Sequence, residues 1–326
     1  MSTKAQRTPI FQISILALAV LALASLTGCG SGRQANRVDP DGSLHGRISL
    51  SGAFAVYPLA VRWSEEFRRV NPDVRIEIDA GGAGKGITDA LTGQVELGMV
   101  SRELNEAEIA RGAVAIAVAR DAVVPTVSAA NPFLSQIMER GLSAETAKRI
   151  WVSGEIRSWG AFLGPDASAD AHVTRLDLFS RSDACGAAET WACWLGVHQE
   201  DLRGEGLNGD PSMASAVGKD SKAIGFNNIG YAFDSETLAP IEGIRILPID
   251  INGNGHIDPD EDFYHSRDAL AAAIADGRYP APPARNLYLV SRGEVSDPVV
   301  RAFLSFIISP AGQRINAEAG YIPVNS

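Results

Sequence analysis

Residues 47–59 read Arg-Ile-Ser-Leu-Ser-Gly-Ala-Phe-Ala-Val-Tyr-Pro-Leu, and they indicate the fold class most clearly. Residues 47–50 form a β-run, and apolar residues at helical spacing then predict a helix over about 57–70. An Asn-Pro pair ends that helix, and alternating apolar residues at 74–78 predict a second strand. A strand, a turn of small residues, a helix and another strand are typical of an α/β fold.

The same pattern continues along the chain in both directions from this unit. A glycine-rich turn at 81–86 leads into another helix, 96–100 is a strand candidate, and 113–128 fits buried sheet. The stretch from about 131 to 280 is less regular. A strand at 287–291, a helix at 297–308 and a last helix ending at Gly320 then follow. Repeated βα units predict mixed, largely parallel sheets flanked by helices.

Composition limits the classes of function. The chain has 326 residues, which favours two domains, and 45% hydrophobic with 21% charged residues is ordinary for a globular protein. With 29 Lys plus Arg against 39 Asp plus Glu, the net charge of −10 excludes a nucleic-acid partner and a polybasic membrane surface. It does not exclude an anionic ligand, because helix N-termini and single arginines set the local potential.

The N-terminus has the features of an export signal. Lys4 and Arg7 precede an apolar run over 13–26, which is shorter than the ~20 residues of a membrane-spanning helix. The sequence Leu-Thr-Gly-Cys ending at Cys29 resembles a lipoprotein lipobox, in which that cysteine is acylated. We therefore predict a signal peptide at 1–28, a lipid-anchored linker at 29–43 and a location on the periplasmic or cell-surface side of a bacterial membrane. Removal of the signal peptide changes the net charge to −12.

Two cysteines remain in the mature chain, Cys185 and Cys193. Exported proteins enter oxidising compartments, in which a pair of cysteines is a candidate for a disulfide. The segment between them reads as a helix, which places them ~12 Å apart, whereas a disulfide needs Cα atoms within ~7 Å. The sequence therefore favours two free thiols.

Several segments together resemble the PstS-like phosphate-binding proteins of bacterial ABC transporters. The matching stretches, in family order, are 51–59, 81–87, 96–102, 150–159 (Ile-Trp-Val-Ser-Gly-Glu-Ile-Arg-Ser-Trp), 181–186 (Arg-Ser-Asp-Ala-Cys-Gly), 223–226 and the tail from 279–280 through 321–324. The resemblance implies a two-domain periplasmic-binding-protein fold of type II, with the ligand in a cleft that closes by hinge motion. It places domain I at 44–128 plus 284–326 and domain II at 129–283.

Three small-residue turns, at 51–55, 81–86 and 183–188, each lead towards a helix. A helix N-terminus offers free N–H groups and partial positive charge to an oxyanion, and small residues allow its close approach. Arg181 can supply a bidentate guanidinium, and Asp183 can orient that arginine or accept a proton from the ligand. With the resemblance, the expected ligand-binding residues are Ser51, Ala53, Phe54, Ala83, Gly84, Ser101, Arg102, Arg181, Asp183, Cys185, Gly186 and Ala187.

The sequence departs from the family pattern at this site. Ala53, Ala83 and Ala187 stand where Thr or Ser is common, Cys185 stands in place of Ser, and Ser101 aligns with a proton-accepting Asp of some members. Each lost neutral hydrogen bond removes about 0.5–1.5 kcal/mol. The candidates to replace these groups are Ser51, Ser182, Lys85 and Arg102. An oxyanion is the leading ligand, and phosphate is one member of that class.

Residues 250–261 read Asp-Ile-Asn-Gly-Asn-Gly-His-Ile-Asp-Pro-Asp-Glu, which matches the EF-hand loop signature. The predicted ligands of a structural Ca²⁺ are Asp250, Asn252, Asn254, His256 through its carbonyl, Asp258 and Glu261. The entering segment 243–249 is short and β-like, so we expect no EF-hand entering helix. We expect calcium to stabilise the protein and not to act as a sensor.

Two functions remain open. The first is a monomeric, lipid-anchored solute-binding protein that delivers phosphate or a related oxyanion to an ABC permease. The alternative is a calcium-stabilised surface or scaffold lipoprotein of the same fold that no longer serves phosphate uptake. Cys185 begins a helix, where a thiol pKa is lowered, but the five histidines show no local partner spacing. We therefore expect no enzymatic activity.

Overall fold

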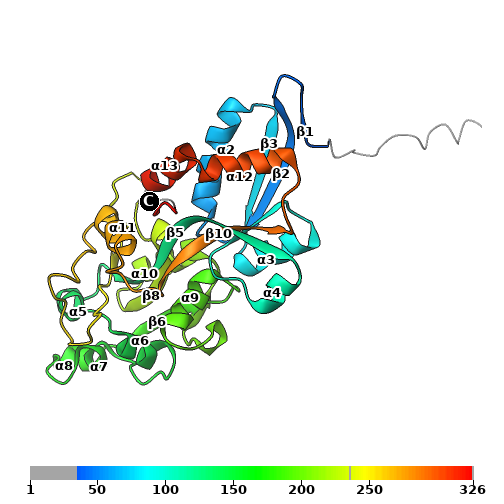
Figure 1. The fold of residues 1–326 in the computed structure, drawn as a ribbon. Helices are drawn as coiled ribbons and strands as arrows, with labels where there is room; N and C mark the ends of the chain where they lie inside the picture. The colour runs from blue at the N-terminus through cyan, green and yellow to red at the C-terminus, as the bar shows by residue number, and fades with distance from the viewer. Residues whose placement is uncertain (1–34, 235, 325–326) are drawn as a thin grey trace, which may run out of the picture. The chain divides into compact units, whose positions relative to one another are not determined.

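A ten-stranded mixed sheet runs through this computed structural model, which describes residues 35–234 and 236–324 (Figure 1). The strands are β1 (Arg37–Val38), β2 (Leu44–Gly52), β3 (Val74–Ala80), β4 (Leu97–Val100), β5 (Ala113–Ser128), β6 (Asp177–Arg181), β7 (Glu205–Leu207), β8 (Ala223–Asn228), β9 (Ile244–Ile246) and β10 (Ala284–Arg292). Their order is β1-β2-β4-β10-β5-β8-β6-β7, with β3 beside β2 and β9 beside β5.

Strand direction differs between the ends and the middle of this sheet. β3 and β4 are parallel to β2, and β7 and β8 are parallel to β6. β5 and β10 are antiparallel to each other from the pair Ala284↔Ala122 to the pair Arg292↔Ala113. The expected parallel ladders are therefore present at both ends, and the expectation of a largely parallel sheet is wrong in the middle. Because β5 has 16 residues, its first part pairs with β10 and its last part pairs with β8 and β9.

Helices cover the sheet. They are α2 (Tyr57–Val70), α3 (Ala83–Thr92), α4 (Glu106–Ala110), α5 (Leu134–Arg140), α6 (Ala144–Trp151), α7 (Trp159–Leu163), α8 (Ala169–Val173), α9 (Gly186–Trp194), α10 (Asp210–Lys219), α11 (Arg267–Ala275), α12 (Pro298–Ile308) and α13 (Pro310–Glu318). α2 has the predicted bounds, with a proline in its first turn and Trp63 and Phe67 buried on its apolar face. Asp297 caps α12 by accepting from two backbone N–H groups.

Buried apolar side chains form separate clusters on either side of the β5–β10 ladder. One cluster takes residues between Ile48 and Ala119 and resumes at Leu287; we call this part the first lobe. Two further clusters take residues between Ala122 and Ala284, together with Ile322; we call this part the second lobe. α2 and α12 lie in the first lobe and α5 to α8 in the second (Figure 1). The division into domains at 128 and 284 stays a prediction.

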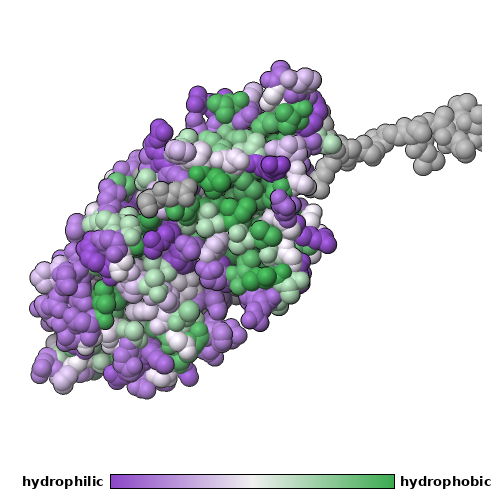
Figure 2. Space-filling view, viewed as in Figure 1, coloured by the Kyte–Doolittle hydropathy of each residue, from purple (hydrophilic) through white to green (hydrophobic). Residues whose placement is uncertain are grey.

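The predicted signal peptide and the lipidation site Cys29 lie outside the described residues. Within the described part of the chain, no helix is long and apolar enough to cross a membrane. Hydrophilic residues dominate the visible face around α5 to α8, whereas hydrophobic residues are more frequent around α12 (Figure 2).

Candidate functional site

Residues from both lobes line a small cavity. Its lining residues are Ala53, Phe54, Ala55, Gly82, Ala83, Ser101, Arg181, Cys185, Gly186, Ala187, Asp210 and Asn228. All three predicted turns contribute to this list.

The first residues of α3 and α9 give the cavity its donors. The first N–H groups of a helix have no intrahelical acceptor, and Ala83, Gly186 and Ala187 occupy those positions here. Gly82, just before α3, has φ +89°, and a Cβ there would lie 2.8 Å from the carbonyl oxygen of Ala184. Only glycine allows this approach of the two lobes. The positive ends of two helices therefore face one small space.

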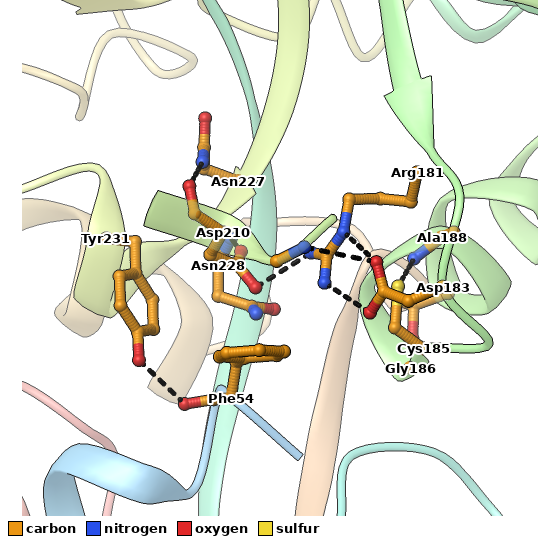
Figure 3. A network of polar contacts seen from close by, with 12 residues as sticks. Phe54, Arg181, Asp183, Cys185, Gly186, Ala188, Asp210, Asn227, Asn228 and Tyr231 are labelled. Atoms are coloured by element: carbon orange, nitrogen blue, oxygen red, sulfur yellow. Dashed lines mark hydrogen bonds and ion pairs between the residues drawn. The ribbon is translucent and has the colours of Figure 1, made fainter. Parts of the chain in front are cut away.

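Arg181 is the cationic side chain of the site, and it is held between two carboxylates (Figure 3). It ends β6, and its side chain is fully buried. Nε and one terminal nitrogen donate to the two carboxylate oxygens of Asp183 at 2.8 and 2.7 Å. The other terminal nitrogen donates to Asp210 Oδ2 at 2.8 Å. Its guanidinium carbon lies 5.7 Å from the ring centroid of Phe54. These contacts fix the guanidinium at the edge of the cavity.

This ion pair stays charged despite its burial. Burial alone raises the pKa of Asp183, but the hydrogen bonds and charge of Arg181 outweigh it, so that the pKa is lowered. Burial lowers the pKa of Arg181, and the carboxylate of Asp210 contributes most to the opposing, larger rise. One guanidinium faces two carboxylates, so side-chain charge at this cluster does not favour an anion. The N-termini of α3 and α9 supply attraction that this cluster lacks.

Gly186 and Ser101, which both line the cavity, are a point of close contact between the lobes. Ser101 follows β4 in the first lobe and is 2% exposed, and Gly186 begins α9 in the second. A Cβ on Gly186 would lie 2.2 Å from Ser101 Oγ and 2.5 Å from the Ser101 carbonyl oxygen. The backbone N–H of Gly84 also donates across the lobes to Ala184 O at 3.4 Å. The structure is therefore closed around the site.

The expected lowering of the Cys185 pKa is wrong. Cys185 is the N-cap of α9, and its Sγ accepts from the N–H of Ala188 at 3.5 Å. Burial raises the pKa of the thiol to about 12, which outweighs the attraction of Arg181. The thiol therefore stays protonated at neutral pH and is a poor nucleophile. Cys185 and Cys193 are both free thiols, and Cys193 is exposed near the far end of the helix.

Four predicted ligand residues do not line the cavity. Ser51 Oγ donates to Asp89 Oδ2 at 2.7 Å, and Arg102 forms an ion pair with Glu108 at 2.7 Å. Gly84 is the second residue of α3 and lies outside the cavity lining. Asp183 lies behind Arg181 and acts through it.

Of the other proposed substitutes for hydroxyl groups, Lys85 pairs with Asp79 and Asp89 at 3.0 and 2.6 Å. Ser182 is outside the lining too. Nearer carboxylates hold both cations, Lys85 and Arg102, away from the site.

Sequence reasoning missed Asp210 and Asn228. Asp210 is the first residue of α10, and its Oδ1 accepts from the backbone N–H of Asn228 at 3.0 Å. Asn228 ends β8. Both come from the irregular middle of the chain. The Gly-Asp-Pro sequence at 209–211 is a helix-start signal that could have pointed to Asp210.

The predicted calcium loop is folded around its two terminal carboxylates. Asp250 and Glu261 are 3% and 4% exposed. Asp250 accepts from the N–H groups of Gly253, Asn254 and Gly255 at 2.7–3.1 Å, and Glu261 accepts from three more within the loop. Gly255 has φ +81°, which the sharp turn at this loop position requires.

No helix enters or leaves this loop directly, since β9 precedes it and α11 begins at Arg267. In the part of the chain that the structure describes, no three His, Cys, Asp or Glu side chains form a metal-holding group. The side chains of Asn252 and Asn254 both donate to Asp258 Oδ2, at 2.8 and 2.9 Å. The donor set would thus consist of carboxylate, amide and carbonyl oxygens, which is the chemistry that Ca²⁺ prefers.

A family model described as the PBP superfamily domain matches residues 37–311. The chain belongs to the PBP superfamily. Among relatives of this PBP-superfamily chain, the phosphate-binding protein PstS of Bacillus subtilis is 25% identical over 317 residues, covering 96% of this chain and 93% of its own. PstS of Pseudomonas aeruginosa is 25% identical over 329 residues, covering 93% and 94%.

Solved structures agree. A Clostridium perfringens protein assigned as a phosphate ABC transporter substrate-binding protein, solved with bound phosphate, has a TM-score of 0.68 and 25% identity to this PBP-superfamily chain, covering 86% of it and 100% of its own chain. An ABC-type phosphate transport receptor from Vibrio cholerae has a TM-score of 0.61 at 20% identity, which shows the fold. The resemblance to PstS-like proteins and the α/β, two-domain fold class are confirmed.

Proposed function

We propose that this PBP-superfamily chain is the solute-binding protein of an ABC transporter and captures phosphate or a related oxyanion in the cavity between its lobes. The observation that carries the proposal is the meeting of two helix N-termini, α3 and α9, with the buried Arg181 around one small cavity. The named relatives are phosphate-binding proteins of nearly the same length, which supports phosphate as the first ligand to test. The cavity lining combines backbone donors with a protonated thiol, which supports the binding of an anion.

Trapping of the anion follows from contacts across the lobes. Tyr231 of the second lobe donates from its hydroxyl to Phe54 O at 3.3 Å, in the turn before α2 (Figure 3). Together with the contact of Gly84 with Ala184, it holds the cavity shut. Release requires these contacts to break as the lobes separate. The protein is expected to act outside the cytoplasmic membrane as a monomer anchored through Cys29.

Titration calorimetry with phosphate, sulfate, arsenate and molybdate tests this function. We expect heat of binding from at least phosphate, and a decrease in the radius of gyration on binding because the open form closes. The alternative function, a calcium-stabilised scaffold lipoprotein, predicts no heat from any of the four anions and an unchanged radius of gyration. That outcome would reject the transport function.

We also propose that residues 250–261 bind one structural Ca²⁺. The proposal rests on the loop signature, with oxygen-bearing residues at every ligand position and glycine at the turn. The loop is attached to the end of α5, since Ile257 N donates to Glu139 O at 2.9 Å and Asp250 N donates to Leu142 O at 3.3 Å. Ordering of the loop would therefore stabilise the second lobe.

Calcium is expected to raise the melting temperature of the protein relative to a chelator. At a free concentration about 100 times Kd, binding to the folded state adds about 2.7 kcal/mol, which is a shift of about 5 °C or more. Glu261→Gln removes a carboxylate at the position that closes the coordination sphere, and should abolish the shift. The exposed Asp262 lies just outside the loop, so Asp262→Asn should keep it. Equal melting temperatures of the wild type in calcium and in chelator would contradict the site.

A further inference from the structure

We propose that Arg285 is a second cation of the anion site, a positioning residue that acts on the ligand through Asn228, α9 and its charge. This inference rests on the proposed function. Arg285 is on β10, directly opposite Asp121 on β5, and its side chain is 6% exposed. It thus projects from the ladder between the lobes and is shielded from water.

The contacts of Arg285 lead to the cavity lining. One terminal nitrogen donates to the carbonyl of Gly186 and to Thr190 Oγ1, the latter at 3.0 Å, both on α9. The other donates to Asn228 Oδ1 and lies 3.5 Å from Asp121 Oδ2. Gly186 and Asn228 both line the cavity. A single buried side chain therefore connects the crossing strands to two walls of the site.

The contact with Asn228 sets the orientation of an amide. Because Asn228 Oδ1 accepts from Arg285, the amide nitrogen is the polar atom of that side chain left to donate elsewhere. No hydrogen bond of Asn228 Nδ2 occurs among the described residues. An oxyanion in the cavity needs donors, and this orientation presents one. Without Arg285, the amide is free to turn its oxygen towards the anion.

The charge of Arg285 also changes the balance around the site. Arg181 faces the carboxylates of Asp183 and Asp210, which leaves an excess of negative charge. Arg285 adds a positive charge on the α9 side. The carboxylate of Asp121, 3.5 Å from that guanidinium, partly offsets this charge. Screening is weak for buried charges. Arg285 should therefore strengthen anion binding, and Asp121 should weaken it.

Two substitutions with opposite expected effects test the inference by calorimetry with inorganic phosphate. Arg285→Gln should weaken binding by about 10- to 100-fold, because it removes a buried charge that contacts Gly186 and Asn228 of the cavity lining. Arg285→Lys keeps the charge and should lose clearly less. Asp121→Asn should strengthen binding several-fold. A merely structural role of the pair would weaken binding in both Arg285→Gln and Asp121→Asn.

Arg120→Gln is the matched control. Arg120 neighbours Asp121 on β5 and donates to Ile274 O, and it does not line the cavity. The affinity of Arg120→Gln for phosphate should therefore stay within about threefold of the wild-type value. If Arg285→Gln binds phosphate as the wild type does, or if Asp121→Asn weakens it, the inference fails while the proposed function stands. If the wild type binds none of the four oxyanions, the proposed function fails and the inference fails with it. Melting temperatures of all variants separate loss of binding from loss of folding.

Discussion

Replacing Arg181 with methionine is expected to abolish anion binding and to destabilise the protein. The side chains of Asp183 and Asp210 are 9% and 1% exposed, and both depend on this guanidinium. Removal of one partner from a buried ion pair costs about 3–5 kcal/mol, because the remaining charge is uncompensated. The variant also loses the only cationic side chain in the cavity lining of the described chain.

The loss of stability in Arg181→Met should depend on pH, with a sign that follows from the pKa of Asp183. Arg181 lowers the pKa of Asp183 in the folded state, so the pair contributes stability that is fully present above the unfolded pKa of about 4 and is lost as pH falls through the folded pKa. In Arg181→Met this contribution is absent. The difference in melting temperature between wild type and variant should be largest near pH 7 and should shrink under strongly acidic conditions.

Arg175→Gln is the control for Arg181→Met. Arg175 forms an ion pair with Asp177 at 2.8 Å, but its side chain is 78% exposed. Exposed pairs contribute about 0–1 kcal/mol, so both stability and anion affinity should change little. A variant at Arg181 that still binds phosphate with wild-type affinity would remove that residue from the site.

Gly186→Ala is expected to prevent closure without unfolding the protein. The added methyl group would lie 2.2 Å from Ser101 Oγ and 2.5 Å from the Ser101 carbonyl oxygen, and backbone cannot move aside as a side chain can. Gly186 does not have a positive φ, so alanine suits the helix and favours it by up to ~1 kcal/mol. Anion affinity should fall by on the order of 100-fold or more, because only the closed form completes the cavity.

Small-angle scattering and calorimetry check this result together. With saturating phosphate, the wild type should become smaller, and Gly186→Ala should keep the radius of gyration of the anion-free protein at an equal or higher melting temperature. Gly218→Ala in α10 is the matched control, since its Cβ would make only ordinary contacts, the nearest at 3.6 Å with Ile244. Wild-type affinity in Gly186→Ala would show that the lobes do not meet there during binding.

Local features of the fold and site were predictable from the sequence. The bounds of α2 follow from its apolar spacing and the Asn-Pro pair after it. The turns before α3 and α9 are signalled by small residues, and Arg181 with Asp183 lies two residues apart, close enough to pair. Lys85 was expected to replace a hydroxyl group at the anion site, but its ion pair with Asp89, four residues on, makes it unavailable to the anion.

Long-range features were not predictable in this way. The antiparallel pairing of β5 with β10 joins residues about 160–180 positions apart, and the sequence of neither segment indicates which strand it pairs with. Asp210 and Asn228 reach the cavity from the start of one helix and the end of one strand, and only the folded chain brings them to Arg181. Arg285 follows a run of prolines and reads as an ordinary surface residue until its burial is seen.

The dependence of the cavity on main-chain donors has an evolutionary consequence. A side-chain hydroxyl disappears in a single substitution, whereas the first N–H groups of α3 and α9 persist through any replacement that keeps the helices and their glycines. The alanines at 53, 83 and 187 then alter the affinity for an anion and leave the main-chain donors in place. Selection can adjust affinity in small steps at those positions, matching the protein to the supply of its nutrient, while the ability to hold an ion is inherited with the fold.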